Sequence, residues 1–249
     1  MVLKNSRRQP QVTVSCIEQL RPNDGHLIAM MQLASPALPI GAFSYSQGLE
    51  AAVNAGLVSN ETQAQEWIGA QFLQSFLPRE IFSLKQAYEC VQAILLGKKK
   101  VHHLAQIDEA FVASRDSAEG RLETRQLGSS LCRWLHSVTP EHPVLELLNQ
   151  LREKQGGDLS SPVAFAGIAL SQGLPESLTR FAWAFSWLEN QVQAAVKLVP
   201  LGQSSGQRVL IALRPLSLRE PPEEPWTCTP HASLLMMRHE RQYSRLFRS

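Results

Sequence analysis

Apolar side chains recur every three or four positions along most of this chain, which is the spacing of one face of an α-helix. The longest segment with this spacing is 178–199, and the others are 27–34, 46–55, 60–77, 81–96, 104–117, 119–138 and 162–173. The expected core-facing residues are Ala64, Trp67, Ile68, Phe72 and Phe76 in the segment 60–77, and Phe181, Phe185, Leu188, Val192 and Val199 in the segment 178–199. The pattern therefore predicts an all-α protein.

Prolines mark where several of these helices are expected to end. Pro36 and Pro39 are three positions apart, which forbids a continuous helix there. Pro78 is expected to interrupt the helix that starts at the cap residue Asn60. The run 208–213 could form a short buried strand, but a lone strand has no partner, so a helix is preferred. Because the sequence shows no alternation of strands with helices, we expect a compact helical bundle in a single domain.

The composition changes along the chain and suggests four parts. Residues 1–25 are polar, basic and poor in large apolar side chains, and they are expected to be a mobile N-terminal arm. Residues 26–214 carry the helical periodicity and are expected to form the core domain. Five prolines fall within 215–231, which predicts an extended connector, and 232–249 follows as a C-terminal tail.

Charge and cysteine usage exclude several classes of protein. The 249 residues are 44% hydrophobic and 18% charged with a formal net charge of +2, so a nucleic-acid-binding surface is not indicated. The basic cluster at 98–103 is interpreted as a solvated helix end. Four cysteines are widely separated, which favours free thiols in a reducing compartment. No apolar run reaches the roughly 20 residues of a membrane span or the length of a signal peptide, so a cytoplasmic location is expected.

Catalytic motifs are absent from the sequence. No phosphate-binding loop is present, and Ser44 and Ser46 lack the Gly-x-Ser-x-Gly elbow of a nucleophilic serine. The carboxylates within 108–123 are mixed with arginines, and side-chain pairs three or four positions apart explain them without acid–base chemistry. They are Asp108, Glu109, Asp116, Glu119 and Glu123, with Arg115, Arg121 and Arg125. We therefore expect no catalytic residue, no cofactor and no enzymatic activity, and a hydrolase using Ser44 or Ser46 is a remote alternative.

Cys228, His231 and His239 are the best candidates for a metal site. Thiolate and imidazole are ligands for borderline metals, but tight sites usually need three or four protein ligands. An incidental pair at Cys228 and His231 is therefore the preferred interpretation. A direct metal-binding role for the three residues is kept as the alternative function.

The segment LASPALPIGAFSYSQGLE at 33–50 resembles the signature of UreF urease accessory proteins. Three more pieces resemble the same family in the same order: 113–128 with ASRD, EGR and QLG; 200–207 with PLGQ and GQ; and the end HERQYSRLFRS at 239–249. The motif residues singled out are Pro36, Pro39, Gly41, Phe43, Ser44, Gln47, Gly48 and Glu50. Pro36, Pro39 and Gly41 are expected to shape a turn while Leu38, Phe43 and Leu49 fill the core, and direct partner contact by this segment is the alternative.

The resemblance implies an all-helical homodimer without chemistry of its own. It implies binding to the accessory protein UreD, also called UreH, and through that complex to the nickel-carrying GTPase UreG, whose GTPase cycle it would modulate. The assembly would then insert nickel into the urease apoprotein. Small residues at 164–169 suggest a face for self-association, namely Ala164, Ala166, Gly167 and Ala169.

The C-terminal tail is the predicted partner-binding element. Tyr243, Leu246 and Phe247 are spaced so that one helical turn would present all three together, flanked by Arg241, Arg245 and Arg248. We expect this tail to be mobile in the free protein and ordered in a complex, because large apolar residues at the chain end are not needed for a core far upstream. Packing of the tail on its own bundle is the alternative. The predicted partner-binding residues are Tyr243, Arg245, Leu246, Phe247 and Arg248.

Overall fold

The protein is all-α in the computed structural model, which describes residues 24–227, 229–240 and 242–248; no strand occurs among them. The helices are α1 (Asp24–Ala34), α2 (Leu49–Asn54), α3 (Glu61–Gln71), α4 (Phe82–Leu95), α5 (Val101–Ala113), α6 (Ala118–Val138), α7 (Pro143–Gln155), α8 (Ser161–Ser171), α9 (Glu176–Leu198), α10 (Gln203–Leu213) and α11 (Pro230–His239). A π-helical stretch, η3 (Phe72–Ile81), and two 3₁₀ turns, η2 (Ala42–Ser44) and η4 (Arg214–Leu218), complete the order. The prediction of an all-α protein is confirmed.

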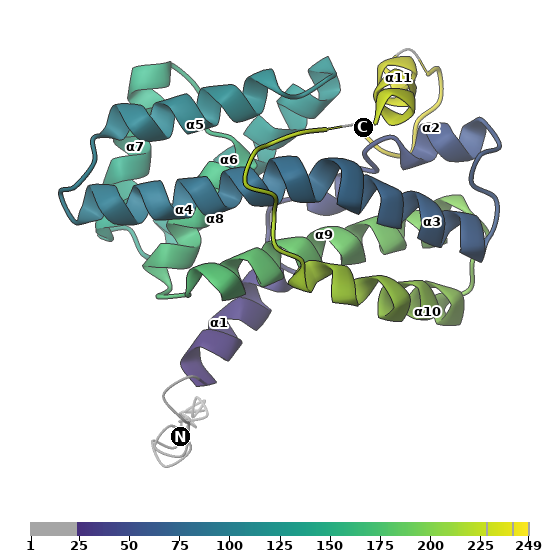
Figure 1. The fold of residues 1–249 in the computed structure, drawn as a ribbon, viewed down its shortest axis with the longest axis horizontal. Coiled ribbons are helices and arrows are strands. Elements are labelled where there is room, and N and C mark those ends of the chain that lie inside the picture. The colour runs from purple at the N-terminus through teal and green to yellow at the C-terminus, as the bar shows by residue number, and fades with distance from the viewer. Residues whose placement is uncertain (1–23, 228, 241, 249) are drawn as a thin grey trace, which may run out of the picture.

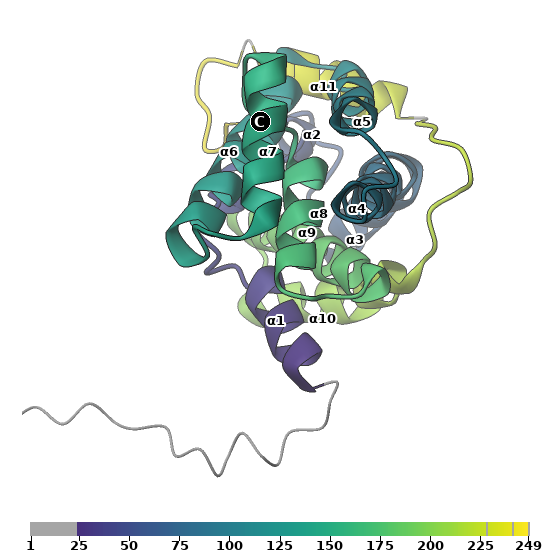
Figure 2. The same cartoon turned by 90° about the vertical axis from the view of Figure 1, so that its left-hand side faces the viewer.

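Helix α8 lies at the centre of the bundle, packed against α4 and α6 (Figures 1 and 2). Its small residues let neighbouring helices approach closely, and a Cβ on Gly167 would lie 3.0 Å from side-chain atoms of Val144 and Leu148. Ala164, Ala166 and Ala169 are fully buried. The proposed self-association face at 164–169 is therefore wrong, because one chain already uses these residues to pack its own core.

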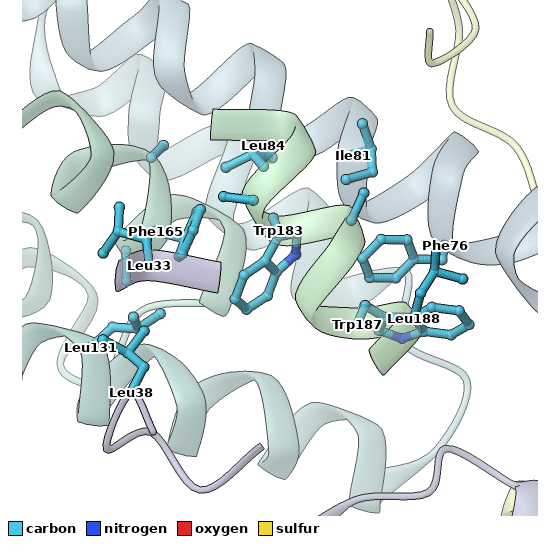
Figure 3. Close-up of a cluster of buried hydrophobic side chains, with 14 of the residues drawn as sticks. Leu33, Leu38, Phe76, Ile81, Leu84, Leu131, Phe165, Trp183, Trp187 and Leu188 are labelled. Atoms are coloured by element: carbon cyan, nitrogen blue, oxygen red, sulfur yellow. The ribbon is translucent and has the colours of Figure 1, made fainter. Parts of the chain in front are cut away.

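The central core joins residues that are far apart in the sequence (Figure 3). Trp187 of α9 stacks on Phe76 of η3 with ring centroids 4.5 Å apart, and Trp183 lies 4.6 Å from Phe165 of α8 by the same measure. Leu33, at the end of α1, is also buried in this cluster. Aromatic pairs at these distances add to the stability that burial alone provides.

Pro78 does not interrupt the helix that begins after Asn60, contrary to the sequence-based expectation. Asn60 caps α3 as predicted, since its side chain accepts a hydrogen bond from the Gln63 amide at 3.0 Å. From there α3, η3 and α4 form one continuous rod. The wider turns of a π-helix change which amides must bond, so a proline without an N–H is accommodated inside η3.

The run 208–213 is helical, as preferred, and belongs to α10. The connector after it is only partly extended, because 214–218 form the 3₁₀ turn η4 before an extended path leads to α11 (Figure 1). The expected mobile arm, 1–25, lies mostly outside the described residues; its last two positions begin α1. Helix α1 projects from the body of the bundle and leaves Leu27, Ile28 and Met31 exposed.

No helix in the described part of the chain is long and apolar enough to cross a membrane. Cys90 and Cys132 are buried free thiols, and burial raises the pKa of the Cys132 thiol to about 11. Both are therefore poor nucleophiles and poor metal ligands. Cys16 and Cys228 lie outside the described residues.

Candidate partner-binding site

The signature segment between α1 and α2 is a chain of tight turns. The amide of Leu38 bonds the carbonyl of Ser35 at 3.0 Å, so the segment of Pro36 and Pro39 turns as expected. Leu38 and Leu49 are buried, which confirms them as core residues. Phe43 is not a core residue, because its side chain is 64% exposed. Phe43 lies in the turn η2 after Gly41 and leaves a large, mostly exposed apolar group at the surface.

Gln47 and Gly48 hold the last turn before α2 in a left-handed conformation. Gln47 has φ of 50°, which is unusual for a residue with a side chain. Its side-chain amide donates to Glu123 at 2.6 Å and accepts from the Trp187 indole at 2.7 Å, and these bonds stabilise the strained backbone. Gly48 has φ of 86°, and a Cβ there would also approach the Met236 side chain at 3.0 Å. Only glycine combines that backbone with the close contact to α11.

Glu50, in the first turn of α2, binds the C-terminal tail directly. Its two carboxylate oxygens accept hydrogen bonds from the backbone amides of Leu246 at 2.8 Å and Phe247 at 2.9 Å. Burial alone would raise the pKa of Glu50, but these two amides and His239 outweigh it and hold the pKa below its ordinary value. The Glu50 carboxylate thus binds two consecutive backbone amides of the tail.

His239 is fully buried between two carboxylates. Its Nε2 lies 3.2 Å from Glu50 and its Nδ1 lies 2.9 Å from Glu119 of α6. Because carboxylates accept hydrogen bonds, the ring satisfies both contacts when both nitrogens carry a proton. Arg245 also bonds Glu119, so α2, α6, α11 and the tail meet in one ionic cluster.

The metal site considered from the sequence gains no support from this geometry. Both ring nitrogens of His239 face carboxylates, His231 is exposed, and Cys228 lies outside the described residues. Within the ranges that the structure describes, no three His, Cys, Asp or Glu side chains group as metal ligands would. His239 is therefore a structural partner of Glu50 and Glu119 in this structure.

The described part of the tail, 242–248, is docked on the bundle and forms no helical turn. Phe247 is only 6% exposed and joins the core, with the Lys197 ammonium 5.7 Å from its ring centroid. Tyr243 is fully exposed and Leu246 is 65% exposed, so the three residues do not share one face. The expected common apolar face is not formed, and the contacts are those of the alternative, in which the tail packs on its own bundle, because Glu50 binds the amides of Leu246 and Phe247. Arg241 and Ser249 lie outside the described residues.

Arg248 joins the tail to the signature segment. Its backbone amide donates to the carbonyl of Ser44 at 2.8 Å, and its side chain lies 3.5 Å from the Gln126 side-chain oxygen. The tail therefore runs next to the turn that exposes Phe43. Residues separated by about 200 positions form a single surface.

A second buried ionic cluster is joined to the signature segment by the hydrogen bond from Gln47 to Glu123. Arg115 bonds Glu80 of η3 at 2.7 Å and lies 3.9 Å from Glu123 of α6, all three nearly inaccessible to solvent. Arg79 lies 3.7 Å from Asp116; burial and then the neighbouring Arg115 lower the pKa of Arg79 to about 10. The prediction that side-chain pairs three or four positions apart account for these charges is wrong, since the ion pairs of Arg115 and Asp116 join residues farther apart in the sequence.

The sequence did not reveal which of these residues would meet. Glu119 and His239 both fall in pieces that carry the family resemblance, which was the only signal available for them. Nothing in local spacing pairs Glu50 with Leu246 and Phe247, 196 and 197 positions away. Such contacts depend on the path of the whole chain.

Comparison with known proteins points to one family. The sequence model of the UreF family matches residues 58–214. The Urease accessory protein UreF of Methylibium petroleiphilum is 45% identical over 234 residues, covering 90% of this chain and 94% of that protein. The protein of the same name from Delftia acidovorans is 41% identical over 240 residues, covering 90% of this chain and 97% of its own length. The chain therefore belongs to the UreF family of urease accessory proteins.

Proposed function

We propose that this protein is a non-enzymatic scaffold of urease maturation that acts in the cytoplasm. It binds a UreD-type (UreH-type) accessory protein and the GTPase UreG, modulates the GTPase cycle, and so supports nickel insertion into the urease apoprotein. The observation that supports it most is the docked tail, which bonds Ser44, next to exposed Phe43, through the Arg248 amide and leaves Tyr243 and Leu246 exposed. Aromatic and large apolar side chains on a rigid support are favoured interface anchors.

The arrangement around this surface favours support over catalysis. Glu50, Glu119 and His239 are engaged with one another and with the tail, so their charges position the backbone. Arg245 and Arg248 flank the apolar residues, and their side chains can form paired hydrogen bonds with partner carboxylates or carbonyls. A preformed surface binds with a smaller ordering cost than a flexible one.

Self-association belongs to the same proposal, as a homodimer. The small residues of α8 are buried and cannot provide the contact. The exposed apolar face of α1, formed by Leu27, Ile28 and Met31, is the surface that the structure offers for a second copy.

The decisive experiment mixes the purified chain with UreD-type and UreG-type proteins from the same organism. We expect a stable, stoichiometric complex in size-exclusion chromatography with light scattering and a changed rate of GTP hydrolysis by the GTPase. The isolated chain should show no saturable GTP binding, because it has no phosphate-binding loop. Failure to form the complex, or GTP hydrolysis by the chain alone, would contradict the scaffold function.

A further inference from the structure

One cavity lies beside the signature segment, and its lining contains no residue of the docked tail. Its volume is about 300 Å³, at the lower end of the range for sites that bind small molecules or single side chains. The end of α1 and the signature segment form one wall, with Leu33, Pro36 and Phe43. Helix α9 forms the other wall, where Trp183 and Trp187 lie one helical turn apart (Figure 3).

Most charges that line the cavity already have partners. Arg115 lies between Glu80 and Glu123, and Glu123 also accepts from Gln47. The Lys197 ammonium lies over the Phe247 ring. The lining therefore contains three carboxylates, Glu80, Glu123 and Glu189, against the two cations Arg115 and Lys197, an excess of one negative charge.

Glu189 of α9 carries this excess. Among the described residues its side chain forms no hydrogen bond and no ion pair. Partial burial raises the pKa of its carboxyl group, with no nearby cation to oppose the effect. A carboxylate in a cavity lined by indole rings would be stabilised by an incoming cation, and aromatic rings add to the attraction for ammonium and guanidinium groups.

We propose that this cavity is a socket for a basic side chain, arginine or lysine, of a protein partner, with Glu189 as the anionic contact and Trp183 and Trp187 as its apolar lining. The inference rests on the proposed scaffold function and names the chemistry of one contact. The mouth of the cavity supports a protein occupant, because the side chain of Phe43 there is 64% exposed. Arginine side chains and aromatic rings that meet in a pocket shielded from water are common interface anchors.

The first experiment uses N-acetyl-arginine amide as the probe and tryptophan fluorescence as the readout. Trp183 and Trp187 line the cavity, so binding should change the emission of the folded chain in a saturable manner. The variant Glu189→Gln removes the charge and should lose this response, while Glu109→Gln, on the exposed side of α5, should keep it. Circular dichroism checks that both variants fold. A response absent from the unaltered chain, or equally strong in Glu189→Gln, overturns the socket.

The second experiment measures the affinity for the UreD-type and UreG-type partners. Glu189→Gln should weaken the complex about tenfold or more, and the charge reversal Glu189→Lys should weaken it further. Unchanged affinity in both variants, with the complex of the unaltered chain intact, overturns the socket and leaves the scaffold function standing. If the unaltered chain forms no complex, the scaffold function fails, and the titration with N-acetyl-arginine amide still decides whether the socket binds a cation.

Discussion

Glu50 shows how one buried carboxylate can organise a distant chain end. The residue is only 5% exposed, and its carboxylate oxygens accept hydrogen bonds from two backbone amides and from His239. The position in the first turn of α2 also favours a negative charge, because the helix dipole is positive there. The cost of burying the carboxylate is thus offset by contacts that only the docked tail provides. Gln47 acts in the same way on a smaller scale, since its two side-chain bonds support a strained turn.

Docking of the tail is expected to weaken at low pH. The pKa of Glu50 is lowered in the folded protein, so its contribution to stability is complete above the ordinary glutamate pKa of about 4.3 and is lost as the pH falls through the lower folded value. At neutral pH we expect Glu50→Gln to reduce the free energy of unfolding by about 1 to 3 kcal/mol. Urea unfolding of both proteins at several pH values measures this.

The difference between the unaltered chain and Glu50→Gln should shrink as the pH is lowered from about 6 to about 3. Other carboxylates titrate in the same range, but they do so in both proteins and cancel in the comparison. Glu66→Gln, on the exposed side of α3, is the matched control and should behave like the unaltered chain. A constant difference across the pH range would show that the charge of Glu50 does not hold the tail.

At the scale of the helices, apolar periodicity predicted where most helices lie. It did not predict features that depend on how the helices pack against one another. The ranges expected for α6 and α9 agree with the structure within a few residues, because each has a long apolar face and a clear end. Pro78 was misjudged because local rules describe an α-helix, whereas η3 is a π-helix. The small residues of α8 were assigned to an external face because periodicity alone does not distinguish a buried helix from an interface.

The contact between α6 and the start of α8 provides a test of close packing. A Cβ on Gly128 would lie 2.0 Å from the carbonyl oxygen of Leu159, so any side chain there must separate the two segments. Asp108 of α5 fixes the same segment from another side, since it accepts from the Ser160 amide at 2.7 Å and from its hydroxyl at 2.6 Å. We expect Gly128→Ala to reduce the free energy of unfolding by about 2 to 3 kcal/mol or more.

Urea unfolding of Gly128→Ala measures the effect. The matched control is Gly157→Ala, where an added Cβ meets no atom within 4 Å, and its effect should stay within about 0.5 kcal/mol. Equal stability of the two variants would mean that the approach of α6 to 159–160 is looser than described.

Helix α1 is the element on which self-association is tested. Ile28 is 55% exposed and Met31 is 68% exposed, so Ile28→Asp with Met31→Asp should leave the fold intact. We expect this double variant to shift the chain from dimer to monomer in sedimentation equilibrium, because charges would be buried in the contact. Ile211→Asp, which alters a similarly exposed residue of α10, is the control and should remain dimeric. Dimers that persist in the α1 variant would place the contact elsewhere.

For the whole molecule, the path of the last residues could not be obtained from local sequence. The sequence suggested partner binding for Tyr243, Leu246 and Phe247 as a group, through a helical turn. The structure divides them, since Phe247 enters the core while Tyr243 and Leu246 face solvent. The division arises because Glu50, His239 and Glu119 fix the tail backbone, and these residues come from three different helices. Only the assembled bundle brings them together.

Because Phe247 is buried while Tyr243 and Leu246 are exposed, substitutions in the tail can affect stability and partner binding separately. Phe247→Ala removes a nearly buried ring and should lower the free energy of unfolding by about 3 kcal/mol. Tyr243→Ser with Leu246→Ser alters exposed side chains, so the melting temperature should stay the same while affinity for the UreD-type and UreG-type partners falls. A loss of about 2 kcal/mol at an interface anchor corresponds to roughly a thirtyfold weaker complex. Calorimetric melting and binding measurements on the same samples give both quantities. If the double variant binds its partners normally while Phe247→Ala fails only through unfolding, the tail completes the core of its own chain and the partners bind elsewhere.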